Sequence, residues 1–373
     1  MPMITREFSQ CITGTEQQRP LLFLDKVFLK PRKTNLRGVE LFNLGLIRDL
    51  AREGIKLAVP IHVSWKEDYN HEGATDQPDF CEMSWKKTLL NGLQAAWRMR
   101  RQHHQKIILA NVANGLIPAL LLMRIFNGPG PFLPIILFAH RMPSARFMAA
   151  LPKKTTRVLA VNGIIAASFR KAGFTDVNVF FGHINAAEFH PAEELTPGPD
   201  AGKKINFCVV GFLDNAWKGA DTALAAFRAM PKDISAKCAL HLASYRSPPS
   251  LPEQNIKTYS WFQTGQMPAW LRNMDVMIVP SRDERVMRET FSLTMVEGML
   301  TGLPIIAANL PVLAEKLDAG GGYTFNNAKE LCRLMVSLAS RPELRAELGK
   351  KARQVALERY VWNTKKFISR YLV

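Results

Sequence analysis

The segment from Arg288 to Leu310 constrains the fold of this chain most, because it reads as a turn, a helix and a strand in close succession. After a polar turn, apolar residues follow at helical spacing: Leu293, Val296 and Leu300. Gly302-Leu303-Pro304 then supplies a glycine cap with a proline beyond it, and residues 305–307 are apolar enough for a buried strand. A helix between a loop and a buried strand is typical of parallel α/β sheets.

Two glutamates eight positions apart mark this segment, with Glu289 in the turn and Glu297 in the helix. At about 1.5 Å per residue, Glu297 lies roughly 8 Å further along the helix axis. The backbone N–H groups of Phe291, Ser292 and Leu293 open the helix, and the positive end of a helix dipole favours a phosphate or diphosphate. A sugar joined through a diphosphate to a ribose would present hydroxyls to both carboxylates.

The charge of the chain is unevenly distributed. Its formal net charge is +17, and the stretch from Met83 to Thr175 holds lysines and arginines but no aspartate or glutamate. An acid-free stretch of this kind favours an anionic partner. Because no apolar run is long enough to span a membrane and the first residues do not resemble a signal peptide, we expect a cytoplasmic protein, with a peripheral position on the inner face of the membrane as a further expectation.

The cysteines are five in number and widely scattered, without a CxxC pair. This pattern fits a reducing compartment and does not support a zinc site. No cluster of aspartate, glutamate or histidine suggests another metal site, so we expect no metal and no cofactor.

Length and composition predict two α/β domains, each with a core of its own. A stretch rich in proline, glycine and aspartate, from Glu193 to Lys203, reads as the linker. We expect a Rossmann-like domain over residues 1–192, completed by a C-terminal helix over residues 360–373, and a second Rossmann-like domain over residues 203–359.

Two segments of the first half have other expected roles. Residues 66–82 are polar and rich in acidic residues, so we expect an exposed insertion. Residues 85–104 are expected to form a basic helix with a broad apolar face. It either lies on an anionic membrane surface or packs on the sheet with its basic ends in solvent.

His140 and Arg141 follow a very apolar expected strand over residues 133–139. Polar residues at the carboxyl end of a buried parallel strand lie where α/β folds bind ligands. His140 is therefore a candidate ligand-facing residue, and a structural role is the alternative.

The segment that contains Glu289 and Glu297 resembles the E-x7-E motif of retaining GT-B glycosyltransferases, in particular the large family usually numbered four. In that family the first glutamate contacts the transferred sugar and the second contacts the ribose. The resemblance implies an α/β fold of the GT-B type, with two Rossmann-like domains that face a central cleft. Thr290 and Ser292 stand where the family often has glycines.

A second match follows the expected strand over residues 205–210, which ends at Gly211. Lys218 with the glycine after it matches the family's Lys-Gly, and the resemblance implies that this lysine neutralises the donor diphosphate. The family's neighbouring arginine is replaced by Phe212. Three arginines are candidates for the missing charge: Arg288, Arg285 and Arg37.

Two weaker matches lie in the first half. The loop at Arg37-Gly38 resembles a Gly-Gly loop that lies near the donor diphosphate in the family, with arginine in place of the first glycine, and an ordinary basic loop is the alternative. His140 matches a histidine that faces the donor sugar in the family. The resemblance thus implies His140 and Glu289 as catalytic residues, and as donor-binding residues Lys218, Glu297, Phe291, Ser292, Leu293, Gly38, Arg37, Gly211 and Arg288.

The implied activity is that of a hexosyltransferase, which moves a sugar from a nucleotide diphosphate sugar to a hydroxyl with retained configuration. The basic first half favours an anionic or membrane-associated glycan or lipid acceptor, as in the assembly of lipopolysaccharide or lipid-linked saccharides. Two alternatives stay open. One is a protein that binds or glycosylates nucleic acid, which the charge permits although no recognition motif is present. The other is a GT-B relative without transferase activity, such as an epimerase, a phosphorylase or a binding subunit.

Overall fold

The chain folds into two compact units, which we call the first unit, Met1–Phe180 with Asn363–Val373, and the second unit, Phe181–Trp362. The linker expected over residues 193–203 lies outside the described residues, and the division falls earlier, after Phe180. The computed structural model describes residues 20–25, 28–29, 38–65, 78–83, 91, 93, 106–110, 114–126, 133–180, 184, 186–192, 204–244, 251–260, 266–282 and 289–372.

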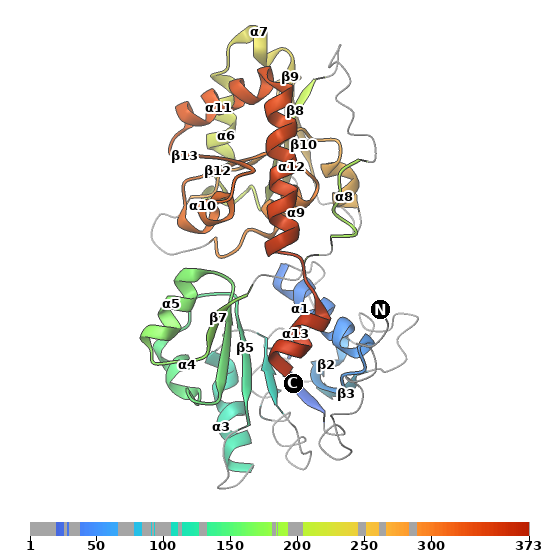
Figure 1. The fold of residues 1–373 in the computed structure, drawn as a ribbon, viewed down its shortest axis with the longest axis vertical. Coiled ribbons are helices and arrows are strands. Elements are labelled where there is room, and N and C mark those ends of the chain that lie inside the picture. The colour runs from blue at the N-terminus through green and yellow to red at the C-terminus, as the bar shows by residue number, and fades with distance from the viewer. Residues whose placement is uncertain are drawn as a thin grey trace, which may run out of the picture. The chain divides into compact units, whose positions relative to one another are not determined.

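A parallel sheet of seven strands forms the centre of the first unit, in the order β3-β2-β1-β4-β5-β6-β7 (Figure 1). Strands β1, β4 and β5 are continuous apolar runs, as expected for strands that are covered on both faces of a parallel sheet. The strands are β1 (Leu21–Leu24), β2 (Leu57–His62), β3 (Asp79–Met83), β4 (Ile107–Leu109), β5 (Ile135–Ala139), β6 (Thr156–Ala160) and β7 (Val177–Val179).

Two helices of the first unit start at recognisable caps. The side chain of Ser144 accepts a hydrogen bond from the Phe147 amide at the start of α4, and Asn162 accepts one from the Ile165 amide at the start of α5. The described helices are α1 (Gly38–Arg52), the short 3₁₀ turn η3 (Asn114–Leu116), α3 (Ile117–Phe126), α4 (Ala145–Ala150) and α5 (Gly163–Lys171).

The expectation of an exposed insertion over residues 66–82 is wrong at its end. Asp79–Met83 form β3, which pairs in parallel with β2. Edge strands often carry charged residues that prevent edge-to-edge pairing, so their polarity resembles that of a loop. The rest of that segment, and nearly all of the basic helix expected over residues 85–104, lie outside the described residues.

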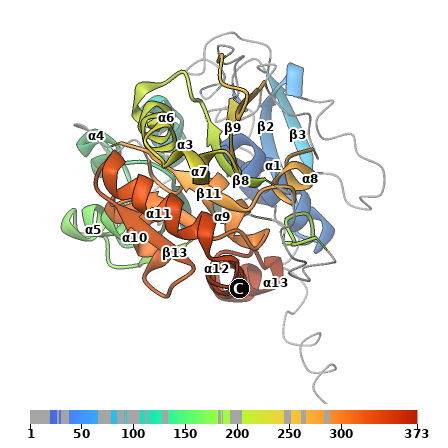
Figure 2. The ribbon, with the colours of Figure 1, turned by 90° about the horizontal axis from the view of Figure 1, so that it is seen from above.

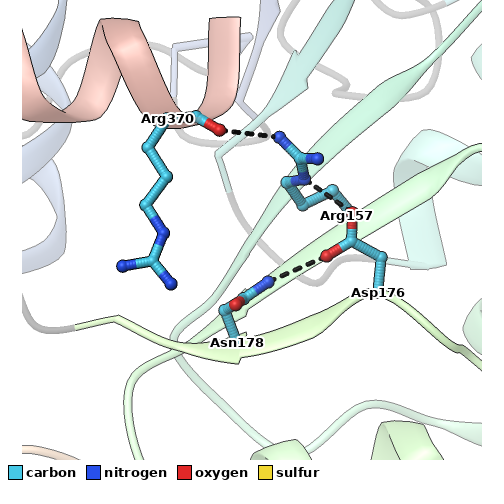
Figure 3. Close-up of polar contacts among 4 residues, drawn as sticks. All are labelled: Arg157, Asp176, Asn178 and Arg370. Carbon is cyan, nitrogen blue, oxygen red and sulfur yellow. Dashed lines mark hydrogen bonds and ion pairs between the residues drawn. The ribbon is translucent and has the colours of Figure 1, made fainter.

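The C-terminal segment packs on the first unit as α13 (Thr364–Phe367) and the π-helix η5 (Ile368–Leu372). Phe367 stacks on Phe138 of β5 with ring centroids 5.7 Å apart. Figure 3 shows the polar part of this contact, in which Arg157 of β6 donates to the Arg370 carbonyl at 3.1 Å and pairs with Asp176 at 2.6 Å. Apolar stacking and one oriented guanidinium therefore hold the last residues.

A second parallel sheet, of six strands in the order β10-β9-β8-β11-β12-β13, forms the centre of the second unit. Its core contains Phe207, Leu240, Ile278 and Ile306 from the four inner strands. The strands are β8 (Ile205–Gly211), β9 (Cys238–Ser244), β10 (Ile256–Tyr259), β11 (Val276–Val279), β12 (Ile305–Ala308) and β13 (Gly322–Phe325).

Helices surround this sheet, as the view from above in Figure 2 shows. A Cβ built on Gly349 would lie 2.1 Å from the Gly302 carbonyl oxygen, so glycine allows α12 to approach the end of α9 closely. The elements are η4 (Ala216–Lys218), α6 (Ala220–Arg228), α7 (Lys232–Ser235), α8 (Gln266–Leu271), α9 (Leu293–Leu300), α10 (Pro311–Leu317), α11 (Ala328–Ser340) and α12 (Pro342–Arg359).

The sequence did not predict the edge strands β10 and β13 of the second unit, nor its short helical elements η4, α7 and α10. Each is short, and both strands have exposed or half-buried residues that weaken the apolar pattern. In the part of the chain that the structure describes, no helix combines the length and the apolar character needed to cross a membrane.

Candidate functional site

The candidate site of the second unit lies at the carboxyl ends of β8 and β11. These strands are neighbours and run parallel, so the loops that follow them emerge at the same edge of the sheet. The loop after β8 carries Lys218, and the loop after β11 carries Ser281 and leads to Glu289.

Two glycines allow the loop after β8 to pack closely against its neighbours. Gly211 has a φ of +152°, and a Cβ built on it would lie 3.4 Å from Cε of Lys218, so this position leaves room for the lysine stem. Gly219 has a φ of +68°, and a Cβ there would lie only 1.9 Å from the Pro280 carbonyl oxygen. The loop that carries Lys218 therefore packs directly on the end of β11.

Arg282 joins the two loops a second time. Its backbone N–H donates to the Trp217 carbonyl at 2.7 Å, and its guanidinium pairs with Asp221 at 2.7 Å and bonds Thr222 at the start of α6. These bonds fix the relative position of Lys218 and Ser281 before any ligand binds.

Lys218 and Glu289 form an ion pair, with Nζ and Oε2 2.7 Å apart. Their side chains are only 14% and 8% exposed, so the pair is largely removed from water. Ser281 donates a hydrogen bond to the same carboxylate oxygen at 3.0 Å, and Nζ of Lys218 also lies 4.4 Å from the Trp217 ring centroid. The structure thus brings together two predicted site residues that are far apart in the sequence.

The turn from Glu289 to Ser292 ends in a conformation that side chains seldom adopt. Ser292 has a φ of +58°, and among the described residues it is the one non-glycine residue with a positive φ. It precedes α9 as the N-cap, but its side chain caps no amide, and its buried Oγ has no hydrogen-bond partner within the described part of the chain. The first amides of α9, at Leu293 and beyond, therefore lack a side-chain cap.

Glu297 lies on α9, a little more than one turn beyond the strained turn. Its side chain is half-buried. Burial, reinforced by the negative charge of Glu188, raises the pKa of Glu297 to about 7. This carboxyl therefore changes its charge close to neutral pH.

His140 occupies the corresponding edge of the sheet in the first unit, directly after β5. It is 9% exposed, with the Phe42 ring edge-on at 5.0 Å and the Phe138 ring stacked at 6.3 Å. Burial, and then the charge of Arg141, lower the pKa of His140 to about 4. The imidazole is therefore neutral at neutral pH, and its buried Nε2 has no partner among the described residues.

The other predicted site residues are only partly described. Gly38 is the first residue of α1, whereas Arg37, Arg285 and Arg288 lie outside the described residues. Sequence reasoning missed Ser281, which binds Glu289, and Lys316, which lies buried beside Phe291. Ser281 had a usable signal, because it stands at the carboxyl end of a predicted strand, but Lys316 had none.

The chemistry of this site is that of an anion and hydroxyl site. A lysine beside uncapped helix amides suits a phosphate group, and a neighbouring carboxylate suits sugar hydroxyls. Within the described residues, no group of three or more histidine, cysteine, aspartate or glutamate side chains is placed to hold a metal ion.

Comparisons with known proteins found a matching family model and two related sequences. The sequence model of the family described as "Glycosyl transferases group 1" matches residues 204–341. A phosphatidyl-myo-inositol mannosyltransferase of Propionibacterium freudenreichii is 26% identical over 234 residues, which are 60% of this chain and 57% of that protein. An uncharacterized 41.2 kDa protein in the cps region of Klebsiella pneumoniae is 31% identical over 90 residues, or 23% of this chain and 24% of that one. The alignments thus span less than two thirds of either relative.

Solved structures match over nearly the whole chain. Anabaena Alr3699/HepE in complex with UDP has a TM-score of 0.71 at 14% identity, over 95% of this chain and 99% of that one. The lipopolysaccharide outer core galactosyltransferase WaaB, in its apo form, has a TM-score of 0.64 at 12% identity, over 95% and 99%. At such low identity this likeness shows the fold, and it confirms the predicted GT-B fold. Residues 204–341 therefore match a group 1 glycosyl transferase domain, and the chain as a whole has a GT-B fold.

Proposed function

We propose that this protein transfers a sugar from a nucleoside diphosphate sugar to a hydroxyl acceptor, with retention of the anomeric configuration. The observation that carries the proposal is the shielded Lys218–Glu289 pair beside the uncapped start of α9. A donor supplies a diphosphate for the cation and the amides, and sugar hydroxyls for the carboxylate. The solved complex of Anabaena Alr3699/HepE with UDP supports a nucleotide ligand for this fold.

In the proposed reaction, the acceptor oxygen bonds to the anomeric carbon as the bond from that carbon to the diphosphate oxygen breaks. The acceptor proton moves to the departing diphosphate on the same face, so no protein nucleophile is required. Lys218 and the amides of residues 291–293 stabilise the negative charge that develops on the diphosphate. Glu289 orients the sugar and Glu297 holds the ribose, and His140, with its neutral imidazole, stays a proposed catalytic residue.

Arg37, Gly38 and Arg288 stay proposed donor contacts, with Gly211 as the residue that seats Lys218. No metal is required in this proposal, because the lysine and the helix dipole supply the positive potential. Assignment to the family usually numbered four is part of the same proposal, because it depends on the roles of Glu289 and Glu297.

Calorimetry with UDP, GDP and ADP tests the donor site directly. We expect one of the three nucleotides to bind the wild-type protein and Lys218→Met to abolish that binding. Lys329→Met is the matched control, because Lys329 is an exposed lysine on α11 of the same unit. Binding by Lys218→Met with wild-type affinity would refute the assigned role of Lys218. In a separate assay, release of nucleoside diphosphate by the wild-type protein from a mixture of donor and acceptor would establish transfer.

For the acceptor, we propose an anionic, membrane-associated glycolipid. Four exposed apolar side chains of the first unit support this: Leu121, Ile125, Met142 and Ile164. Exposed basic residues accompany them, namely Arg141, Arg146, Lys153 and Lys154. A surface with apolar anchors and basic charge suits the boundary of an anionic bilayer. The name of the mannosyltransferase relative also points to a lipid acceptor.

The elements that carry these side chains are in contact. The Ser144 hydroxyl donates to Asn114 Oδ1 at 2.6 Å, which joins the start of α4 to the turn before α3. The Ser168 hydroxyl lies 3.7 Å from the Met142 sulfur, which joins α5 to the loop before α4. The elements that carry the four apolar side chains are therefore neighbours in the first unit.

Vesicle flotation tests this surface. We expect binding to vesicles that contain anionic phospholipid, weaker binding to neutral vesicles, and loss of binding in the double variant Leu121→Glu/Ile125→Glu. Leu357→Glu, which alters an exposed leucine on α12 of the second unit, is the control. Equal binding of the wild-type protein to neutral and anionic vesicles would contradict the proposal.

The same experiments separate the two alternatives. Salt-sensitive binding to DNA without binding to vesicles would favour a nucleic-acid partner for the basic first unit. Tight nucleotide binding without release of nucleoside diphosphate, over a panel of donors and acceptors, would favour a GT-B relative without transferase activity.

A further inference from the structure

Lys316 is a fully buried cation that the proposed reaction does not use. It lies in the last turn of α10 and is 1% exposed. Its Nζ donates to the Val312 carbonyl one helical turn earlier, at 3.1 Å. A lysine is seldom buried to this extent unless its charge is compensated, so its surroundings need an explanation.

Two aromatic rings surround the ammonium group. Nζ lies 4.6 Å from the Phe291 ring centroid and 5.6 Å from that of Tyr360, and the two rings meet edge-on at 6.0 Å. A cation over aromatic faces is attracted by their quadrupoles, most strongly where water is excluded. Because Phe291 belongs to the turn from Glu289 to Ser292, Lys316 contacts that turn through the Phe291 ring.

Nearby carboxylates partly offset the effect of burial on the pKa of Lys316. Burial lowers the pKa of Lys316 to about 8, while the carboxylates of Glu315, on its own helix, and Glu289, before α9, act in the other direction. Tyr360, at the end of α12, has its pKa raised to about 12 by burial, so its hydroxyl is neutral. Lys316 is therefore mainly protonated at neutral pH, and Glu289 lies in the field of two lysines.

Donor binding changes what each lysine must do. In the structure Lys218 is paired with Glu289, but in the proposed reaction it must also neutralise a diphosphate. A buried carboxylate that loses its cation is strongly destabilised. A second, fixed cation near Glu289 would remove this conflict.

We propose that Lys316 is a positioning residue, whose ammonium group holds the Glu289–Ser292 turn through the Phe291 ring and remains as a second cation near Glu289 when Lys218 turns to the donor diphosphate. The inference rests on the proposed function of the Lys218–Glu289 pair.

The test is calorimetric binding of UDP, GDP and ADP to the full chain, at pH values from about 7 to about 9.5. At the lower pH we expect Lys316→Met to bind the preferred nucleotide about tenfold more weakly than the wild-type protein. As the pH rises above the pKa of Lys316, the wild-type protein loses this charge, so the difference should shrink to less than about twofold. A purely structural role for the side chain would give a constant difference.

Arg345→Met is the matched control. Arg345 is also a buried cation of the second unit, and it donates to the Leu338 carbonyl at 2.7 Å at the end of α11. We expect this variant to lose stability and to keep the wild-type pH profile of nucleotide binding. If Lys316→Met does not fold, Phe291→Leu removes the ring and retains both the backbone amide and the lysine, and it should also weaken nucleotide binding.

The outcomes separate this inference from the proposed function. A wild-type protein that binds none of the three nucleotides overturns the proposed function and this inference with it. A wild-type protein that binds, together with Lys316→Met of equal affinity or with a parallel pH profile, overturns this inference alone. Unchanged binding by Phe291→Leu overturns it as well.

Discussion

The carboxyl edges of the two sheets hold their polar groups in opposite ways. In the second unit, Lys218 and Glu289 are charged, shielded from water and paired with each other. In the first unit, His140 is neutral and lies between aromatic rings, and Asn43 of α1 donates a hydrogen bond to buried Asp25 after β1. The difference shows that the second unit pairs opposite charges at this edge, whereas the first unit shields a neutral imidazole with aromatic rings.

The source of order also differs. In the second unit, close backbone approaches at Gly219 and the bonds of Arg282 fix the loops that carry the charges. In the first unit, ring packing fixes His140, because Phe42 and Phe138 contact it directly. Substitution of single charged residues should therefore have large effects in the second unit. In the first unit, the contribution of His140 to stability should depend on pH.

Removal of the Lys218 charge should have the largest effect on the second unit, in both stability and nucleotide binding. Lys218→Met leaves Glu289 shielded from water without its cation, so we expect the free energy of unfolding to fall by about 3 kcal/mol and nucleotide binding to be lost. The double variant Lys218→Met/Glu289→Gln should regain most of the stability and none of the binding. Urea unfolding and calorimetry measure the two effects, and single and double variants of equal stability would contradict the pairing.

For the first unit, pH is the sharper tool. The pKa of His140 is lowered from 6.5 to about 4 in the folded state, so the unfolded state binds more protons and stability falls as the pH drops through this window. The loss attributable to His140 should reach about 3 kcal/mol at the acidic end. His140→Phe, which retains an aromatic ring, should lack this component. Unfolding curves with the same pH slope in both proteins would show that His140 is not held neutral.

Glu297 should respond with the opposite sign. Its pKa is raised from 4.5 to about 7 in the folded state, so the folded state binds more protons and stability is lost as the pH rises through this window. At pH 8, the free energy of unfolding of Glu297→Gln should therefore be about 2 kcal/mol higher than that of the wild-type protein, which urea unfolding measures. At low pH the two proteins should be equally stable. Weaker nucleotide binding by this more stable variant would support a ribose contact, and unchanged binding would contradict it.

Arg282→Ala should produce the smallest effect. The guanidinium is partly exposed, so its ion pair with Asp221 contributes at most about 1 kcal/mol to stability. Because the variant retains the backbone bond to Trp217 and loosens only one side of the loop, nucleotide affinity should fall a few-fold. A loss as large as that of Lys218→Met would mean that Arg282 itself contacts the ligand.

Much of the fold followed from local patterns. The apolar strand that ends before His140 and the helix closed by Gly302 were predicted close to their observed bounds. Prediction failed at short edge elements, because β3, β10 and β13 carry polar or exposed residues that weaken the apolar pattern. A residue's place in a sheet depends on its neighbours in space, which a pattern along the chain does not record.

The candidate site shows the same division. The spacing of Glu289 and Glu297 was legible because both lie on one turn and helix. The ion pair of Lys218 with Glu289 was not predicted, because the resemblance implied only that the lysine contacts the donor diphosphate and the glutamate the sugar. Lys316 was not predicted either, because nothing in its sequence neighbourhood distinguishes it from an exposed helical lysine.

The sequence by itself determined the alternation of strands and helices, the two glutamates at the start of α9 and the acid-free character of the first half. Only the tertiary structure decided which cations surround Glu289 and that His140 is neutral. The physical reason is that helix and strand formation depends on neighbours along the chain, whereas the energy of a charge depends on burial and on groups within a few ångströms, whatever their position in the sequence.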